Sequence, residues 1–122
     1  MMEVFDEDLH SGVNLALEVG EVHYRDKTGL QDLIIFENNR FGRVMSLDGA
    51  IQTTENDEFI YHEMFVHVPI LAHGSVKRVL IIGGGDGGAA RQALKHKEIS
   101  VTLVDIDRTV IDLSIKYLPS IS

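Results

Sequence analysis

Residues 79–82 are four consecutive apolar side chains, and they lead directly into a turn that is almost entirely glycine. Asp86 is the one residue of the segment 83–88 that is not glycine. An apolar run followed by G-x-G-x-x-G, here Gly83, Gly85 and Gly88, predicts a buried strand that turns sharply into a helix. A chain with this segment is predicted to contain the start of a nucleotide-binding βαβ unit.

A second strand is predicted at residues 100–104, and Asp105 follows it. A carboxylate in this place accepts hydrogen bonds from ribose hydroxyls, so Asp105 is the candidate nucleoside contact, while Asp107 is placed to cap the next helix. The first glycine permits the tight turn, the second lets a ligand come close, and the third lets the helix pack on the strand. The alternative is a turn that binds nothing, which the accompanying acid disfavours.

Asp86 is the unusual residue of the turn, because open α/β sheets bind ligands at the carboxyl ends of their strands. A carboxylate there would repel a pyrophosphate, so an NAD-binding domain is disfavoured. It would attract a positively charged nucleoside or an amine. The other interpretation is that Asp86 only shapes or caps the turn.

The N-terminal part of the chain has a different pattern. Short apolar or alternating runs, separated by turn residues, extend from Leu15 to Thr53, and Asp48-Gly49 lies between two of them. Asp-Gly between such runs is a strong hairpin signal. The sequence therefore predicts an α/β chain, with a small antiparallel β meander at residues 15–53 followed by the start of a parallel sheet.

Residues 57–68 change to a helical pattern, which Asn56 or Asp57 can cap. Pro69 is expected to end this helix, because the residue before a proline avoids the helical region. The predicted apolar face consists of Phe59, Ile60, Met64 and Val68. After a boundary at Gly74-Ser75, the pattern predicts a strand at 78–82, a helix at 87–97, a strand at 100–104 and a helix at 107–117.

Glu58 and His62 are four residues apart and share one face of the predicted helix. This spacing can orient an imidazole, but by itself it favours a surface pair, and Tyr61 by itself favours a core residue with a satisfied hydroxyl. No metal site is predicted, because His62 and His67 point in different directions. The remaining histidines are assigned only surface or loop positions: His10, His23, His67, His73 and His96.

The composition of the chain indicates which kinds of ligand and which cellular location are compatible with it. The net charge of −8 disfavours nucleic acid and favours a cationic ligand, although acidity for solubility alone is the simpler explanation. The chain has no cysteine, which is compatible with a reducing cytoplasm. No run approaches the roughly 20 apolar residues that a membrane helix needs, and the acidic N-terminus argues against a signal peptide.

Four motifs in order resemble the spermidine synthases, which are polyamine aminopropyltransferases. They are residues 31–36, 47–55, 57–64 and 81–88, and the likeness extends from about Tyr24 to Pro119. The resemblance implies a β domain at residues 1–55, a helix and connection at 56–76, and the first βαβα part of a Rossmann-like, methyltransferase-type catalytic domain at 77–122. It also implies a homodimer or higher homo-oligomer, and a cytoplasmic location is the expectation from the composition.

The resemblance implies transfer of an aminopropyl group from decarboxylated S-adenosylmethionine, a co-substrate, to putrescine. The products would be spermidine and 5′-methylthioadenosine, with no cofactor. By position, Gln31 and Asp105 would contact the nucleoside, and Gly83 and Gly85 would shape its pocket. The amine-binding residues would be Tyr61, His62 and Asp86.

Complete members of this family are more than twice as long, and their catalytic aspartate lies in an Asp-x-x-Asp-Pro segment. No such segment occurs in the 122 residues, and Asp105 stands where a glutamate is usual. The general base is therefore expected beyond Ser122, and the 122 residues are expected to be a fragment that is inactive by itself. The alternative is a non-catalytic module that binds a nucleoside or mediates oligomerisation.

Overall fold

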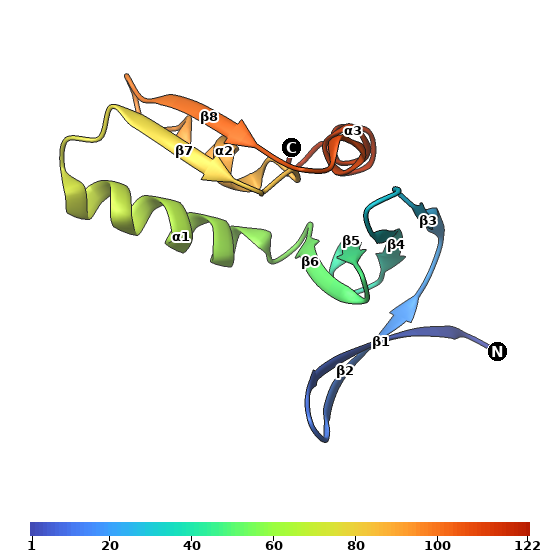
Figure 1. The fold of residues 1–122 in the computed structure, drawn as a ribbon. Helices are drawn as coiled ribbons and strands as arrows, with labels where there is room; N and C mark the ends of the chain where they lie inside the picture. Colours follow the sequence, from blue (N-terminus) through green and yellow to red (C-terminus); the bar gives the residue numbers. More distant parts are fainter. The chain divides into compact units, whose positions relative to one another are not determined.

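The computed structural model describes all residues from Met1 to Ser122, with eight strands and three helices (Figure 1). The chain divides into two compact units, Met1–Asn56 and Asp57–Ser122. The strands of the first unit are β1 (Glu3–His10), β2 (Val13–Val19), β3 (Val22–Lys27), β4 (Asp32–Asn38), β5 (Gly42–Leu47) and β6 (Ala50–Thr54). None of the three helices combines the length and the apolar content that crossing a membrane requires.

The first unit is entirely antiparallel. β1 and β2 form a hairpin, and β3 to β6 form a four-stranded sheet in sequence order. The predicted Asp48-Gly49 hairpin is confirmed, since Leu47 pairs with Ala50 and both turn residues have positive φ, 49° and 78°. One core cluster of this unit consists of Leu17, Val19, Phe36 and Val44, with Phe5, Ile34, Phe41 and Ile51 packed against it.

Strand β1 is absent from the prediction, which began the meander at Leu15. Its acidic residues conceal a period-2 pattern, because Phe5 and Glu7 are half-buried while the residues between and beside them are exposed. The partly alternating run from Leu15 to Tyr24 is divided between two strands, β2 and β3. Strand β2 ends before Gly20, and the Gly20 N–H donates a hydrogen bond to the Glu37 carbonyl at 2.8 Å.

Glu37 on β4 joins two other side chains of the first unit, His23 and Arg43. Its Oε1 accepts hydrogen bonds from His23 Nε2 at 2.8 Å and from Arg43 Nε at 3.0 Å. These bonds hold the pKa of Glu37 below its ordinary value of 4.5, and the bond from His23 has the larger effect. His23 is thus half-buried and bonded, so the surface or loop position assigned to it is wrong.

A lowered carboxyl pKa predicts the sign of a pH effect. The unfolded Glu37 takes up a proton at a higher pH than the folded one, so its contribution to stability is present above about pH 4.5 and is lost as pH falls through its folded pKa. In a profile of melting temperature against pH, part of the fall on the acid side comes from protonation of Glu37. We expect Glu37→Gln to remove that part of the fall. The same change at exposed Glu18 on β2 is the control and should leave the fall unchanged. Equal falls on the acid side for Glu37→Gln and the parent chain would contradict the prediction.

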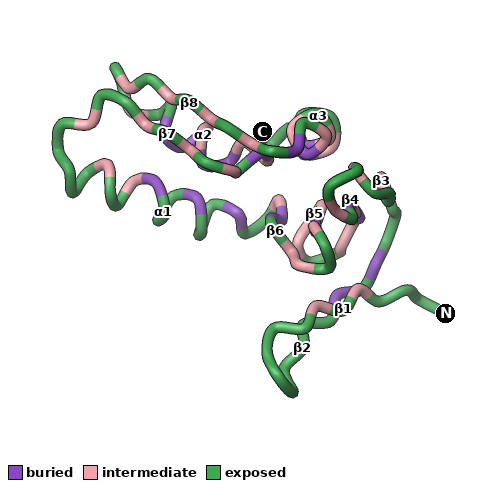
Figure 2. The backbone as a smooth tube through the Cα atoms, in the orientation of Figure 1, coloured by how far each residue is buried: buried purple, intermediate pink, exposed green.

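The second unit has five elements: α1 (Glu58–His73), β7 (Arg78–Ile82), α2 (Gly88–Ala93), β8 (Ser100–Val104) and α3 (Arg108–Tyr117). β7 and β8 pair in parallel from Arg78↔Ser100 to Ile82↔Val104, so the expected fold class, antiparallel strands followed by the start of a parallel sheet, is confirmed. Val66 of α1 and Ala89 and Ala93 of α2 form a core with side chains of one sheet face. On the other face Leu80, Ile82 and Val104 are exposed, as the alternating colours along β7 and β8 indicate (Figure 2).

Two predictions about α1 are wrong. The helix does not end before Pro69 but continues to His73, because Ile70 packs on the core and Gly74 closes the helix in a left-handed conformation. The four predicted apolar-face residues are exposed, and the buried residues of α1 are instead Glu58, His62 and Val66, spaced by four. An apolar groove of about 450 Å³ runs between α1 and β7, lined by Phe65, Pro69, Leu80 and others.

Candidate functional site

The turn between β7 and α2 requires glycine for two separate reasons, which are positive φ angles at some positions and a lack of space for a Cβ at others. Gly83, Gly84 and Gly87 have φ of 83°, 71° and 86°, a left-handed conformation that side chains rarely adopt. At Gly85 and Gly88 φ is not positive, but a Cβ would collide with a neighbour. Added at Gly85, it would lie 2.7 Å from the Asp105 carboxylate.

Asp105 ties the end of β8 to this turn. Its Oδ2 accepts a hydrogen bond from the Gly85 N–H at 2.8 Å, and its Oδ1 accepts one from the Asp107 N–H at 2.8 Å. A carboxylate offers about four acceptor positions, so capacity remains for hydroxyl donors. The predicted cap by Asp107 is confirmed, since its Oδ1 accepts from the Thr109 N–H at 3.0 Å.

Asp86 has a local bond and a neighbouring imidazole. Its Oδ1 accepts from the Gly88 N–H at 2.8 Å, as a turn-shaping residue would. The same oxygen lies 3.7 Å from His62 Nε2, and both side chains are largely buried. The bond to Gly88 bears out the turn-shaping interpretation of Asp86, and the attraction of a cationic ligand stays a prediction.

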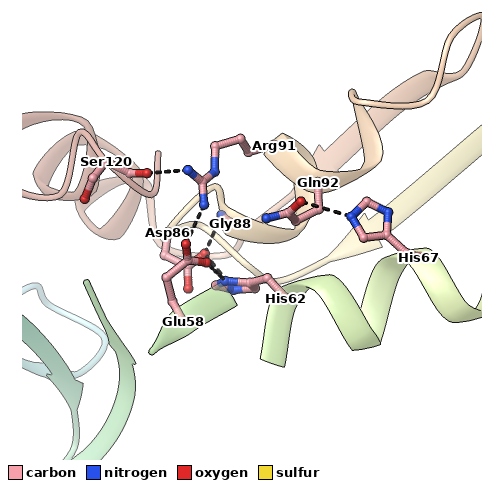
Figure 3. Close-up of polar contacts among 8 residues, drawn as sticks. All are labelled: Glu58, His62, His67, Asp86, Gly88, Arg91, Gln92 and Ser120. Atoms are coloured by element: carbon pink, nitrogen blue, oxygen red, sulfur yellow. Dashed lines mark hydrogen bonds and ion pairs between the residues drawn. The ribbon is translucent and has the colours of Figure 1, made fainter. Parts of the chain in front are cut away.

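His62 is held over the turn by α1, as Figure 3 shows. Its Nδ1 hydrogen bonds to Glu58 Oε2 one turn earlier on the helix. Glu58 and His62 are 8% and 3% exposed, so the surface pair that their spacing favoured is wrong. A Cβ at Gly88 would overlap the His62 ring, so this third glycine makes room for an imidazole from another helix rather than only for packing against the strand.

Arg91 of α2 is a residue that the sequence analysis missed. Its guanidinium donates to Glu58 Oε1 and to the Ser120 carbonyl, both at 2.5 Å (Figure 3). The pair crosses 33 residues of sequence, so no local spacing could have revealed it. The polar cluster thus consists of Asp86, His62, Glu58 and Arg91, contributed by the glycine turn, α1 and α2.

His67 lies one turn and a residue further along α1, in a second polar contact. Its Nδ1 is 2.8 Å from His96 Nε2, and its Nε2 is 3.1 Å from the Oε1 of fully buried Gln92. His67 and His96 are both half-buried. The surface or loop position assigned to His67 is therefore wrong, whereas His96 does lie in the loop between α2 and β8.

The remaining expected site residues are Tyr61 and Gln31. Tyr61 is exposed rather than in the core, and its ring stacks on Phe65 at 5.4 Å and meets His62 edge-on at 5.3 Å. Gln31 belongs to the first unit, in the turn between β3 and β4, and lines a hollow of about 300 Å³ with Lys27, Asp32 and Asp48. Within the second unit, the structure brings His62 and Asp86 together and bonds Asp105 to the same turn.

Two family models match consecutive parts of the chain. The model described as "Spermidine synthase tetramerisation domain" matches residues 4–55, and the model described as "Spermine/spermidine synthase domain" matches residues 58–122. Together they cover nearly every residue.

Individual relatives agree with these matches. The chain is 56% identical over 119 residues to the polyamine aminopropyltransferase of Erwinia tasmaniensis and 57% identical over 117 residues to that of Ruegeria sp., covering 97% and 95% of this chain. The spermidine synthase structure from Thermotoga maritima has a TM-score of 0.94 at 43% identity and covers 98% of this chain. A spermidine synthase in complex with the transition-state analogue AdoDATO gives the same TM-score and identity.

The matched chain is shorter than these relatives. It spans 42% of the Erwinia protein, 41% of the Ruegeria protein and 43% of the Thermotoga chain.

Proposed function

The chain belongs to the spermidine synthase family, and from this membership we propose that it takes part in aminopropyl transfer from decarboxylated S-adenosylmethionine to putrescine. Spermidine and 5′-methylthioadenosine are the products. The observation that carries the proposal is the carboxylate of Asp86 inside a glycine turn, 3.7 Å from a buried imidazole nitrogen. Such a pair suits a cationic amine and disfavours a phosphate.

The proposed roles follow the chemistry of the two substrates. Asp105 and Gln31 contact the nucleoside, with Gly83 and Gly85 shaping its pocket, and the free acceptor capacity of Asp105 supports its role toward a ribose. Tyr61, His62 and Asp86 hold amine groups. These polar groups align an amine nitrogen with the carbon beside sulfur, and alignment is the main requirement of such a displacement.

The attacking amine must be neutral, although free aliphatic amines titrate near pH ~10. A general base is therefore required, and no Asp-x-x-Asp-Pro segment occurs within the 122 residues. We propose that the 122 residues supply contacts that bind the substrates and that, by themselves, they do not catalyse spermidine formation. Spermidine formation by the purified 122 residues would overturn this part of the proposal.

Calorimetric titration with 5′-methylthioadenosine tests the nucleoside site. We expect binding by the 122-residue chain and its loss in Asp105→Ala, because the ribose loses its acceptor. Asp112→Ala is the matched control, since that carboxylate lies on α3 and pairs only with exposed Arg108 at 3.4 Å. Circular dichroism checks that each variant is folded. A folded chain that does not bind the nucleoside contradicts the proposed site.

Residues 1–55 are proposed to mediate homo-oligomerisation, with residues 56–76 as a connection and 77–122 as part of the catalytic domain. The match to a tetramerisation domain supports this, as do the unpaired edges of the hairpin and of the four-stranded sheet. The same match favours the second candidate function, a non-catalytic oligomerisation module. An oligomer in sedimentation that binds no nucleoside would support the module. A cytoplasmic location stays a prediction from the composition.

A further inference from the structure

Glu58 is the centre of an arrangement that the proposed function does not use. Each of its carboxylate oxygens has its own partner: Oε1 accepts from Arg91, and Oε2 contacts His62 Nδ1 (Figure 3). Four groups thus follow one another in space as Arg91, Glu58, His62 and Asp86. The two inner ones are almost fully buried, so this order is held by packing as well as by charge.

The carboxylate of Glu58 determines which nitrogen of the His62 ring carries hydrogen. An ionised carboxylate can only accept a hydrogen bond, so Nδ1 must donate. In the neutral ring Nε2 is then an acceptor, and at 3.7 Å from Asp86 Oδ1 it is too far away for a hydrogen bond. Two acceptors, the imidazole nitrogen and the carboxylate, therefore lie side by side, which suits an ammonium group with several N–H donors.

Arg91 is needed to keep this arrangement. A buried carboxylate is unfavourable without a cation, and Arg91 supplies one while the Ser120 carbonyl fixes the other side of its guanidinium. Without Arg91, the ring of His62 would lie between two uncompensated carboxylates, Glu58 on α1 and Asp86 in the turn. A ring protonated on both nitrogens would then be favoured by the two carboxylates, and Nε2, carrying hydrogen, could no longer accept a hydrogen bond from the amine.

We propose that Arg91 is a positioning residue, which acts through Glu58 to keep the His62 ring as the Nδ1–H tautomer with Nε2 turned to Asp86 as an amine acceptor. Its use in amine binding rests on the proposed function, whereas the tautomer itself does not.

The test is ¹⁵N NMR of the histidine rings in the 122-residue chain at about pH 7.5, one unit above the ordinary histidine pKa. We expect His62 to carry hydrogen on Nδ1 only. In Arg91→Gln this single form should be lost to a doubly protonated ring, and Arg91→Lys, which restores a cation, should recover it. Arg108→Gln removes an exposed arginine on α3 and should leave the His62 signals unchanged. An Nδ1-only ring in Arg91→Gln, or an Nε2–H ring in the parent chain, would overturn the proposal.

Arg91→Gln leaves Glu58 buried and unpaired, so it can fail to fold. The double variant Arg91→Gln/Glu58→Gln removes both charges together and avoids this cost. It should give a mixture of the two neutral tautomers, because the amide introduced at position 58 can either donate or accept. A ring that keeps only Nδ1–H in the double variant would overturn the proposal.

Adding putrescine to the same samples separates this inference from the proposed function. A change in the Nε2 signal of the parent chain, lost in Arg91→Gln, supports both. No change in a ring that is otherwise an Nδ1–H tautomer contradicts the amine-binding role of His62, while the dependence of the tautomer on Arg91 remains supported.

Discussion

Gly88→Ala is expected to destabilise the second unit by about 3 kcal/mol, which corresponds to a fall in melting temperature of more than about 10 °C. The added methyl group would occupy the space of the His62 ring, so the imidazole must leave its buried position and lose its bond to Glu58. Thermal unfolding followed by circular dichroism measures the effect.

A second substitution makes this prediction specific. In a His62→Ala background the ring is gone, and Gly88→Ala should be neutral or stabilising by up to about 1 kcal/mol, because alanine is the better helix former. Gly83→Ala is a control for backbone strain alone, since its Cβ would meet nothing within 4 Å while φ is 83°, and it should cost about 1–2 kcal/mol. Equal losses from Gly88→Ala with and without His62 would show that the overlap is not the cause.

Phe36→Ala should have an effect of similar or larger size on the first unit, about 3–5 kcal/mol. Phe36 is fully buried on β4 and packs against the Phe5 ring at 5.5 Å, so its removal leaves a cavity where β1 meets the sheet. Hydrogen exchange read by mass spectrometry should show faster exchange in β4 and β5. The proposed oligomer should dissociate as well, since it depends on this unit.

The matched control for Phe36 is Phe59→Ala. Phe59 is 48% exposed on α1, and its loss should change stability by no more than about 0.5 kcal/mol. A loss below about 1 kcal/mol in Phe36→Ala would show that its ring does not carry the packing of the first unit.

Much of the fold follows from short-range signals. The strand, glycine turn and second strand of the βαβ unit, the Asp48-Gly49 hairpin and the Asp107 cap each depend on a few adjacent residues, and all were predicted. In each case the required backbone conformation or hydrogen bond is satisfied within the segment itself. Local chemistry is therefore sufficient to identify them.

The errors come from tertiary partners. Glu58 and His62 look like a surface pair because polar side chains at helical spacing normally face water, and only Arg91 and the glycine turn make their burial possible. Pro69 continues a helix because Ile70 packs on a core formed largely by other elements. Strand β1 is hidden by its acidic residues and is identified only by its pairing with β2. The partners of α1 lie far from it in the sequence, whereas β2 directly follows β1.

The glycine turn also has a consequence at the level of the gene. Every missense change within a glycine codon adds at least a Cβ, whichever base is altered. At Gly85 and Gly88 that atom collides with Asp105 or His62, and at Gly83, Gly84 and Gly87 it strains a left-handed backbone. At each of these five codons a missense change therefore has a structural cost. Only at Gly85 and Gly88 can an earlier change of the facing residue, Asp105 or His62, remove that cost.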